Sequence, residues 1–324
     1  MIMGKAYVYA VARIRALEKT LFSDAVIRRL MACQTYEQCL LFLEEKGWGD
    51  GTTSQNIEEM LTEEEAKIWK IMKELDVPKK MMDIMNAPVR FHNLKAAVKA
   101  VYTGETGRTI FYEDAEKSGE ELIRIIEERD YQRLPKGMRE SGQEAFEALL
   151  HTGDGQVCDM IIDKAALEWI REAGAEACEV CLRDYAECVV ALADIKIVVR
   201  AQRMKKSVEF MKRFTAECSS LSVKRLAEAA SGGAAEISSY LRQTPYADGA
   251  ESLMQSMASF ERWCDERMIH MIFRQKYETF GIGPVMAYVI ARQNEIKTVR
   301  IILTGKYNHL SEQFISERIR KMYG

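Results

Sequence analysis

Apolar residues recur along the chain at the three- and four-residue spacing of amphipathic helices. Near the N-terminus, Tyr7, Val11, Ile14 and Leu21 follow this period. A further apolar stripe predicts a helix over about 108–130. No window of the sequence combines strand-like alternation of apolar and polar residues with a hairpin signal. The pattern therefore predicts an all-α protein.

Capping residues and prolines predict where the helices begin. Three segments have the Ser/Thr-x-x-Glu/Gln pattern of a capping box, and we expect each to open a helix: Thr35–Gln38, Thr62–Glu65 and Ser141–Glu144. Proline begins or ends a helix more readily than it continues one, and every proline lies at a predicted element edge. The five are Pro78, Pro88, Pro135, Pro245 and Pro284.

The longest helical patterns lie in the second half of the chain. The sequence from Ala175 to about Cys218 predicts a long helix, either unbroken or interrupted near Asp194. The closing stretch, 281–323, starts with turn-forming residues and continues as a long helix with a polar belt over 292–295. It breaks at Gly305 and ends in a short basic helix. Because this long helix is apolar on more than one face, we expect it to be buried.

Composition fits a folded protein and removes several function classes. Of 324 residues, 48% are hydrophobic and 29% are charged, as in ordinary globular proteins. The net charge of -3 argues against a general nucleic-acid binder, which needs a basic excess. Arg13 and Arg15 interrupt the apolar N-terminal stretch, so we expect no signal peptide. The most apolar window, Cys188–Val199, is too short to span a bilayer, so any membrane role would be peripheral.

Candidate catalytic and ligand-binding motifs are weak. Cys178, Cys181 and Cys188 have spacings that place them on one helix face, but no histidine is near in the sequence. We expect reduced thiols in a packing seam rather than a metal site. The Leu-Thr-Gly-Lys segment at 303–306 lacks the first glycine and the Ser or Thr of a phosphate loop. We therefore expect no catalytic residue, no cofactor, no metal and no bound nucleotide.

An internal repeat organises the chain. Four segments place a Lys or Arg late in one helix and end at a tyrosine after a short helix; the basic residues are Arg13, Lys95, Arg200 and Arg300. Gaps of 82, 105 and 100 residues separate them, which suits similar domains rather than a solenoid. We expect helical repeat domains over 1–87, 88–193 and 194–283, and closing helices over 284–324 that pack back on the body. Three similar domains predict a pseudo-threefold arrangement around a central axis, which suits an adaptor.

The repeat residues also carry a resemblance to a known family. The segments 7–21, 91–100 and above all 284–323 resemble the C subunit of V/A-type ATPases, the equivalent of the d subunit of the eukaryotic V-ATPase. In the last segment, the residues that match are Pro284, Tyr288, Glu295, Lys297, Val299, Arg300, Gly305 and Lys306. The middle copy matches at His92, Asn93, Leu94 and Lys95, and the third copy at Asp194 and Arg200.

The resemblance implies an all-α, funnel-shaped protein of three similar domains. It implies a peripheral, non-catalytic rotor subunit on the cytoplasmic face of the cell membrane. Its implied partners are the proteolipid ring and the D and F subunits of the central stalk, and the end of the stalk would enter a central depression. Such a subunit transmits torque and so couples ATP hydrolysis or synthesis to ion transport. It binds neither nucleotide nor nucleic acid.

Basic residues are the candidates for partner binding. The stretch 200–206 supplies Arg200, Arg203 and Lys205, and the repeat adds Arg13, Lys95 and Arg300. The alternative interpretation is that these residues are solvated helix faces or form ion pairs within the chain.

Two functions other than a rotor subunit would leave different signals. A free-standing helical-repeat scaffold for protein–protein interaction would need a shorter repeat with an exposed aromatic or basic stripe. A helical-bundle enzyme would need inward-facing Glu-x-x-His ligands.

Overall fold

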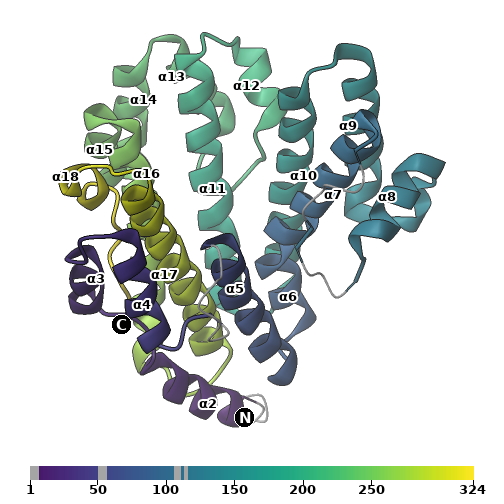
Figure 1. Cartoon of the computed structure of the whole chain (residues 1–324). Helices are drawn as coiled ribbons and strands as arrows, with labels where there is room; N and C mark the ends of the chain where they lie inside the picture. The colour runs from purple at the N-terminus through teal and green to yellow at the C-terminus, as the bar shows by residue number, and fades with distance from the viewer. Residues whose placement is uncertain (1–6, 50–56, 106–110, 113–115) are drawn as a thin grey trace. The chain divides into compact units, whose positions relative to one another are not determined.

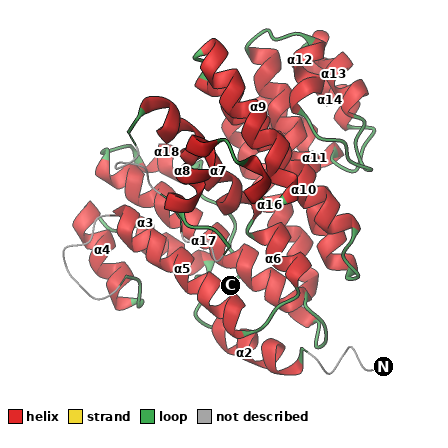
Figure 2. Cartoon of the chain, turned by 90° about the vertical axis from the view of Figure 1, so that its right-hand side faces the viewer, coloured by secondary structure: helices red, strands yellow, loops and turns green. Residues whose placement is uncertain are grey.

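The computed structural model describes residues 7–49, 57–105, 111–112 and 116–324. Every regular element in these ranges is a helix, which confirms the all-α prediction (Figure 2). The chain divides into two compact units: unit 1 combines Met1–Val77 with Asp248–Gly324, and unit 2 is Pro78–Ala247. Unit 1 therefore joins the two ends of the chain, whereas unit 2 is one continuous segment (Figure 1).

Unit 1 is built around one long helix, α17 (Gly283–Tyr307). The helices around it are α2 (Val8–Glu18), α3 (Asp24–Met31), α4 (Tyr36–Glu45), α5 (Ile57–Glu74), α15 (Ala250–Gln255), α16 (Met257–Ile272) and α18 (Glu312–Ser316). Two 3-10 turns, η3 (Ala247–Gly249) and η4 (Phe273–Tyr277), complete the unit, and η3 begins at the last residue of unit 2. Helix α17 packs against α2, α3, α4, α5, α16 and α18. It is buried on most sides, as the sequence predicted for a helix with several apolar faces.

Unit 2 is a bundle in which α10 (Gly155–Ala175) lies centrally. Its other helices are α6 (Lys79–Met85), α7 (Ala87–Thr103), α8 (Gly119–Glu128), α9 (Lys136–Thr152), α11 (Val180–Arg203), α12 (Val208–Phe214), α13 (Val223–Ser231) and α14 (Ala234–Leu241), with the 3-10 turn η2 (Tyr131–Arg133). Helix α10 packs against α6, α7, α9 and α11. Gly104 ends α7 in the left-handed conformation, as expected of a C-terminal glycine.

Local signals located some helix ends correctly and others wrongly. The Thr35 hydroxyl accepts the N–H of Gln38 at 3.3 Å, so the first predicted cap is confirmed. The predicted caps at Thr62 and Ser141 are wrong, because α5 and α9 run through these positions. Helix α11 continues without a break through Asp194 but ends at Arg203, so the predicted extension to about Cys218 is wrong. Helix α17 continues two residues past Gly305, so the predicted break there is wrong.

Three long helices share one buried polar position. Asn93 in α7, Asp194 in α11 and Glu295 in α17 are each almost fully buried. Each side chain accepts a backbone N–H from a segment that precedes a short helix. The bonds are Tyr112 N to Asn93 Oδ1 (3.0 Å), Ala216 N to Asp194 Oδ1 (2.9 Å) and Phe22 N to Glu295 Oε2 (2.7 Å). The three positions are 101 residues apart in each case.

This common hydrogen bond sets the register of the internal repeat. It aligns Lys95 with Lys196 and Lys297, rather than with Arg200 and Arg300 as the basic residues alone suggested. In the copy that contains Glu295, the N–H donor Phe22 comes from the N-terminal segment and the acceptor Glu295 from the C-terminal helix. The two ends of the chain therefore complete one copy together. The predicted domain borders at 87, 193 and 283 stay a prediction.

Candidate partner-binding site

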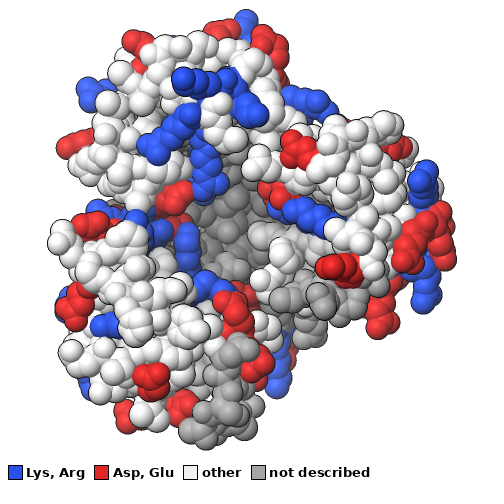
Figure 3. All heavy atoms as spheres, turned by 45° about the horizontal axis from the view of Figure 1, so that its top comes forward, with Lys and Arg blue, Asp and Glu red and all other residues white. Residues whose placement is uncertain are grey.

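The C-terminal end of α11 carries a group of exposed cations, Arg200, Arg203, Lys205 and Lys206, which we call the basic end. Two backbone hydrogen bonds close the helix there, from Lys205 N to Gln202 O (2.9 Å) and from Lys206 N to Ala201 O (3.0 Å). Cations at this position are stabilised by the negative end of the helix dipole. Figure 3 shows Lys and Arg side chains gathered in the region of α11, α12 and α13.

Lys205 has an unusual backbone conformation for its residue type. Its φ is +54°, in the left-handed region where a helix-ending residue is most often glycine. A lysine there costs about 1 kcal/mol relative to glycine because of its Cβ. A lysine therefore occupies a position at which glycine would have less backbone strain.

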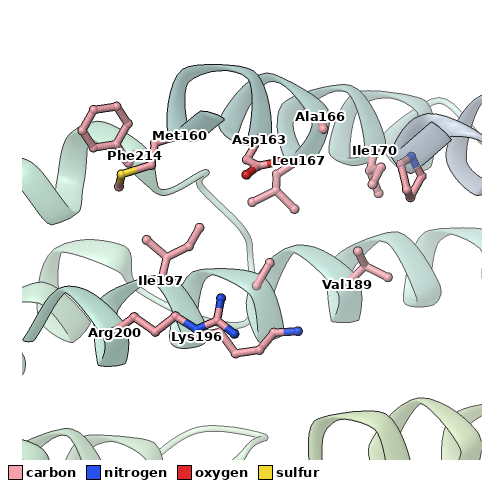
Figure 4. Close-up of a pocket in the computed structure, with 12 residues that line it drawn as sticks. Met160, Asp163, Ala166, Leu167, Ile170, Val189, Lys196, Ile197, Arg200 and Phe214 are labelled. Carbon is pink, nitrogen blue, oxygen red and sulfur yellow. The ribbon is translucent and has the colours of Figure 1, made fainter. Parts of the chain in front are cut away.

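An apolar groove adjoins the basic end. It has a volume of about 310 Å³ and runs between α10 and α11, and we call it the α10–α11 groove. Figure 4 shows Met160, Leu167 and Ile170 on α10 facing Val189 and Ile197 on α11. Lys196 and Arg200 project from the α11 wall of the same groove. The groove thus has an apolar lining, buried at Leu167 and Ile170 and half-buried at Ile197, beside two cations.

The acid in the groove is already engaged. Asp163 on α10 forms a salt bridge with Lys95 of α7 at 2.6 Å, and Lys99 binds Asp159 one turn away at 2.7 Å. In the C-terminal copy, the equivalent lysine, Lys297, also forms a salt bridge, with Asp265 of the preceding helix α16 at 2.6 Å. Lys196, at the position of Lys297, makes no ion pair within the described part of the chain. The α11 wall therefore keeps a positive charge that an acidic partner would neutralise.

The six residues predicted to bind a partner fall into two groups. Arg13 forms an ion pair with Glu74, Lys95 with Asp163, and Arg300 with Glu58 at 2.6 Å. These three are held within their own units.

Arg200, Arg203 and Lys205 form the second group, on the basic end. Among residues the structure describes, Arg203 and Lys205 make no ion pair. Of these three, Arg200 also lines the α10–α11 groove, which the sequence did not predict. The sequence did contain a signal for this groove, because Val189, Ala193 and Ile197 form a second apolar stripe on α11.

The polar belt of α17 is an ionic cluster inside unit 1. Arg292 pairs with both Glu295 on its own helix and Glu64 of α5, and its guanidinium lies 4.6 Å from the ring centroid of Trp48. Glu64 also accepts hydrogen bonds from Lys67 at 2.6 Å and from the N–H of Gly49 at 3.0 Å. Arg292 thus joins α17 to α5 through its pair with Glu64. The third member, Glu64, was missed because its segment was interpreted as a helix cap.

Three further observations concern metal binding, the cysteines and membrane-spanning helices. Within the described ranges, no three His, Cys, Asp or Glu side chains are grouped so that they could hold a metal ion. Cys178 lies in the turn before α11, so the predicted common helix face of the three cysteines is wrong. No described helix combines the length and apolarity that crossing a bilayer requires.

Comparison with known proteins assigns most of the chain to one family model. Residues 10–318 match the model described as ATP synthase (C/AC39) subunit. The C subunit of the V-type sodium ATPase of Enterococcus hirae is 24% identical over 273 residues, covering 83% of each chain. The C subunit of the A-type ATP synthase of Methanocaldococcus jannaschii is 22% identical, over 95% of this chain and 85% of its own.

Proposed function

This chain belongs to the ATP synthase (C/AC39) subunit family and is a subunit of a rotary ATPase, and from this premise we propose that it is the non-catalytic rotor subunit linking the central stalk to the membrane proteolipid ring. In this role it lies peripherally on the cytoplasmic face of the membrane. It passes torque between the D and F subunits of the stalk and the ring, and so couples ATP hydrolysis or synthesis to ion transport. The match over residues 10–318 carries the proposal.

The architecture of each unit supports a mechanical role. A subunit that transmits torque must resist bending, and helices packed at crystal-like density supply such stiffness. Helix α17 spans 25 residues and α11 spans 24, and both are buried along most of their length. The ionic cluster of Glu64, Arg292 and Glu295 ties α5 to α17, so the N-terminal and C-terminal segments of unit 1 are held to each other.

The basic end and the α10–α11 groove are the proposed contact with the stalk. A protein contact of this kind combines an apolar centre with charged residues at its rim. Here Leu167 and Ile197 supply the apolar floor, and Arg200, Arg203 and Lys205 supply the cations. We infer that the stalk presents acidic side chains and a short apolar surface at this place.

Charge reversal at the basic end tests this contact. The variant Arg200→Glu, Arg203→Glu, Lys205→Glu is expected to bind the purified stalk pair about tenfold or more weakly, because attraction at the rim becomes repulsion. Binding is measured by pull-down and by titration at two salt concentrations. The matched control reverses three exposed cations elsewhere in unit 2, Arg124, Lys136 and Arg242. Equal affinity of both variants and the wild type, with unchanged circular dichroism, would remove the basic end from the interface.

A further inference from the structure

Two exposed aromatic residues lie three positions apart in one short segment of unit 1. Tyr277 and Phe280 lie in the segment that joins α16 to α17, at the end of η4 and just after it. Tyr277 is 88% exposed, the highest value for any large apolar side chain in the described ranges, and Phe280 is 59% exposed. We call these two residues the aromatic tip. Neighbouring exposed aromatic residues commonly mark a contact surface.

The backbone beneath the aromatic tip is held firmly. Arg15 of α2 donates to the carbonyl oxygens of Gln275 (2.8 Å) and Glu278 (2.7 Å), while its other terminal nitrogen binds Glu18. On the other side, the Phe273 ring packs 5.5 Å from the ring of Tyr323. Figure 1 shows the C-terminus and α2 close together at this end of unit 1. The two rings are therefore presented to solvent by an anchored segment.

The charges around the aromatic tip are mainly positive. Arg274 is exposed, and neither it nor Lys276 makes an ion pair with any residue that the structure describes. The ammonium of Lys276 lies 4.8 Å from the Tyr323 ring centroid, which keeps the lysine beside the tip. Of the nearby acids, Glu18 is bound by Arg15, and Glu278 accepts the N–H of Phe280 at 3.3 Å.

We propose that the aromatic tip inserts into the headgroup region of an anionic lipid surface, with Arg274 and Lys276 facing the lipid phosphates. This inference rests on the proposed function, which puts the chain at a membrane face. Tyrosine rings favour the membrane interface because one end is apolar and the other forms hydrogen bonds. Lysine and arginine are attracted to anionic headgroups within a Debye length. A contact of two rings and two cations binds weakly alone, which suits a subunit held mainly by its protein partners.

Vesicle flotation with the purified full chain tests the aromatic contribution. Vesicles of phosphatidylcholine mixed with phosphatidylglycerol are expected to bind the wild type, and Tyr277→Ser with Phe280→Ser is expected to lower the affinity about tenfold or more. The matched control, Tyr307→Ser with Phe314→Ser, removes aromatic side chains that are 67% and 41% exposed at the other end of α17. This control is expected to bind like the wild type.

A second pair of variants tests the charges. Arg274→Gln with Lys276→Gln is expected to weaken binding to the anionic vesicles about 25-fold, at roughly fivefold for each cation. The control Arg28→Gln with Lys70→Gln removes two exposed cations elsewhere in unit 1 and leaves binding unchanged. Vesicles of phosphatidylcholine alone are expected to bind the wild type more weakly than the anionic vesicles do.

Three outcomes would overturn the proposal. They are a wild type that binds neither vesicle type, equal losses in the test and control variants, and capture by the detergent-solubilised proteolipid ring without any vesicle binding. The last result would assign the aromatic tip to a protein contact if Tyr277→Ser with Phe280→Ser abolished the capture. Binding of the soluble stalk pair needs no lipid, so a chain that binds the stalk but not vesicles contradicts the lipid contact and leaves the proposed function standing.

Discussion

Glu295 illustrates how one buried side chain affects the stability of unit 1. Its carboxylate is 1% exposed, pairs with Arg292 and accepts the N–H of Phe22 from the N-terminal segment. Burial raises the pKa of Glu295 from 4.5 to about 7, against the lowering effects of Arg292 and the Phe22 N–H, and the nearby Glu64 raises it further. The groups that face it are therefore one backbone N–H, one cation and one acid.

This raised pKa predicts a specific dependence of stability on pH. The folded chain holds the Glu295 proton more tightly than the unfolded chain, so this carboxyl lowers the free energy of unfolding as the pH rises from about 4.5 through about 7. Glu295→Gln has no proton to lose. We expect the wild type to lose up to about 3 kcal/mol relative to this variant between pH 5 and 8.

Urea unfolding of the two proteins across that pH range measures the difference directly. Glu45→Gln, which changes an exposed glutamate at the end of α4, serves as control and should follow the wild-type pH curve. A stability difference between wild type and Glu295→Gln that stays constant from pH 5 to 8 would show that Glu295 does not titrate there.

The sequence held a signal for the partner of Arg292 that the capping pattern concealed. Met60, Glu64, Ile68 and Met72 recur at four-residue spacing, so Glu64 lies within the buried stripe of α5. An acid on such a stripe predicts a buried cation opposite it. Which cation it meets depends on the packing of α5 against α17, 228 residues away in the chain, and no local pattern contains that information.

At the scale of helices, close approach of α10 and α11 depends on a glycine. A Cβ built on Gly174 would lie 2.4 Å from the Cβ of Ala186 on α11. Because both atoms are fixed to helix backbones, the two helices would have to move apart. The α10–α11 groove lies between the same two helices.

Gly174→Ala is therefore expected to destabilise the chain. Overpacking of this kind costs about 1–3 kcal/mol, which outweighs the higher helix propensity of alanine. Gly155→Ala is the control on the same helix, since its nearest neighbour would be an ordinary 3.9 Å contact with Lys99. Thermal unfolding of both variants separates the two effects. If Gly174→Ala were as stable as Gly155→Ala, the close helix contact would be wrong.

Helix existence was more predictable than helix boundaries. Proline positions were reliable because the missing N–H restricts proline to a helix start or a turn, as at Pro88 in the first turn of α7. Capping pairs were less reliable, because Ser141 and its neighbours can also lie inside a helix. There Ser141 donates to the Met138 carbonyl at 3.3 Å, and the helix begins at Lys136 instead. Whether Ser141 begins a helix or lies inside one depends on the buried contacts of Met138 and Ala145.

At the scale of the whole molecule, the repeat was detectable in the sequence but its register was not. Of the basic residues that first indicated it, Arg200 is exposed, and Arg13, Lys95 and Arg300 are half-buried and held in ion pairs. The buried acceptors Asn93, Asp194 and Glu295 define the repeat more closely because each must meet a backbone N–H. Their common role is visible only when the donors Tyr112, Ala216 and Phe22 are located in space.

The membership of the chain in its family followed from its residues, whereas its contacts did not. The C-terminal segment from Pro284 to Lys306 is informative because most of it forms the core of unit 1. The proposed partner contacts lie on surfaces, at the basic end and the aromatic tip. There exposure and the absence of an internal ion pair distinguish Arg203 from Arg13, and both properties depend on tertiary structure.

Assembly of the stalk pair with the proteolipid ring, in the presence and absence of this chain, tests the proposed linking role most directly. We expect the purified D and F subunits and the detergent-solubilised ring to co-elute in size-exclusion chromatography only when the chain is added, with all components then eluting as one complex. Co-elution of stalk and ring without the chain, or a chain that elutes alone in their presence, would contradict the linking role.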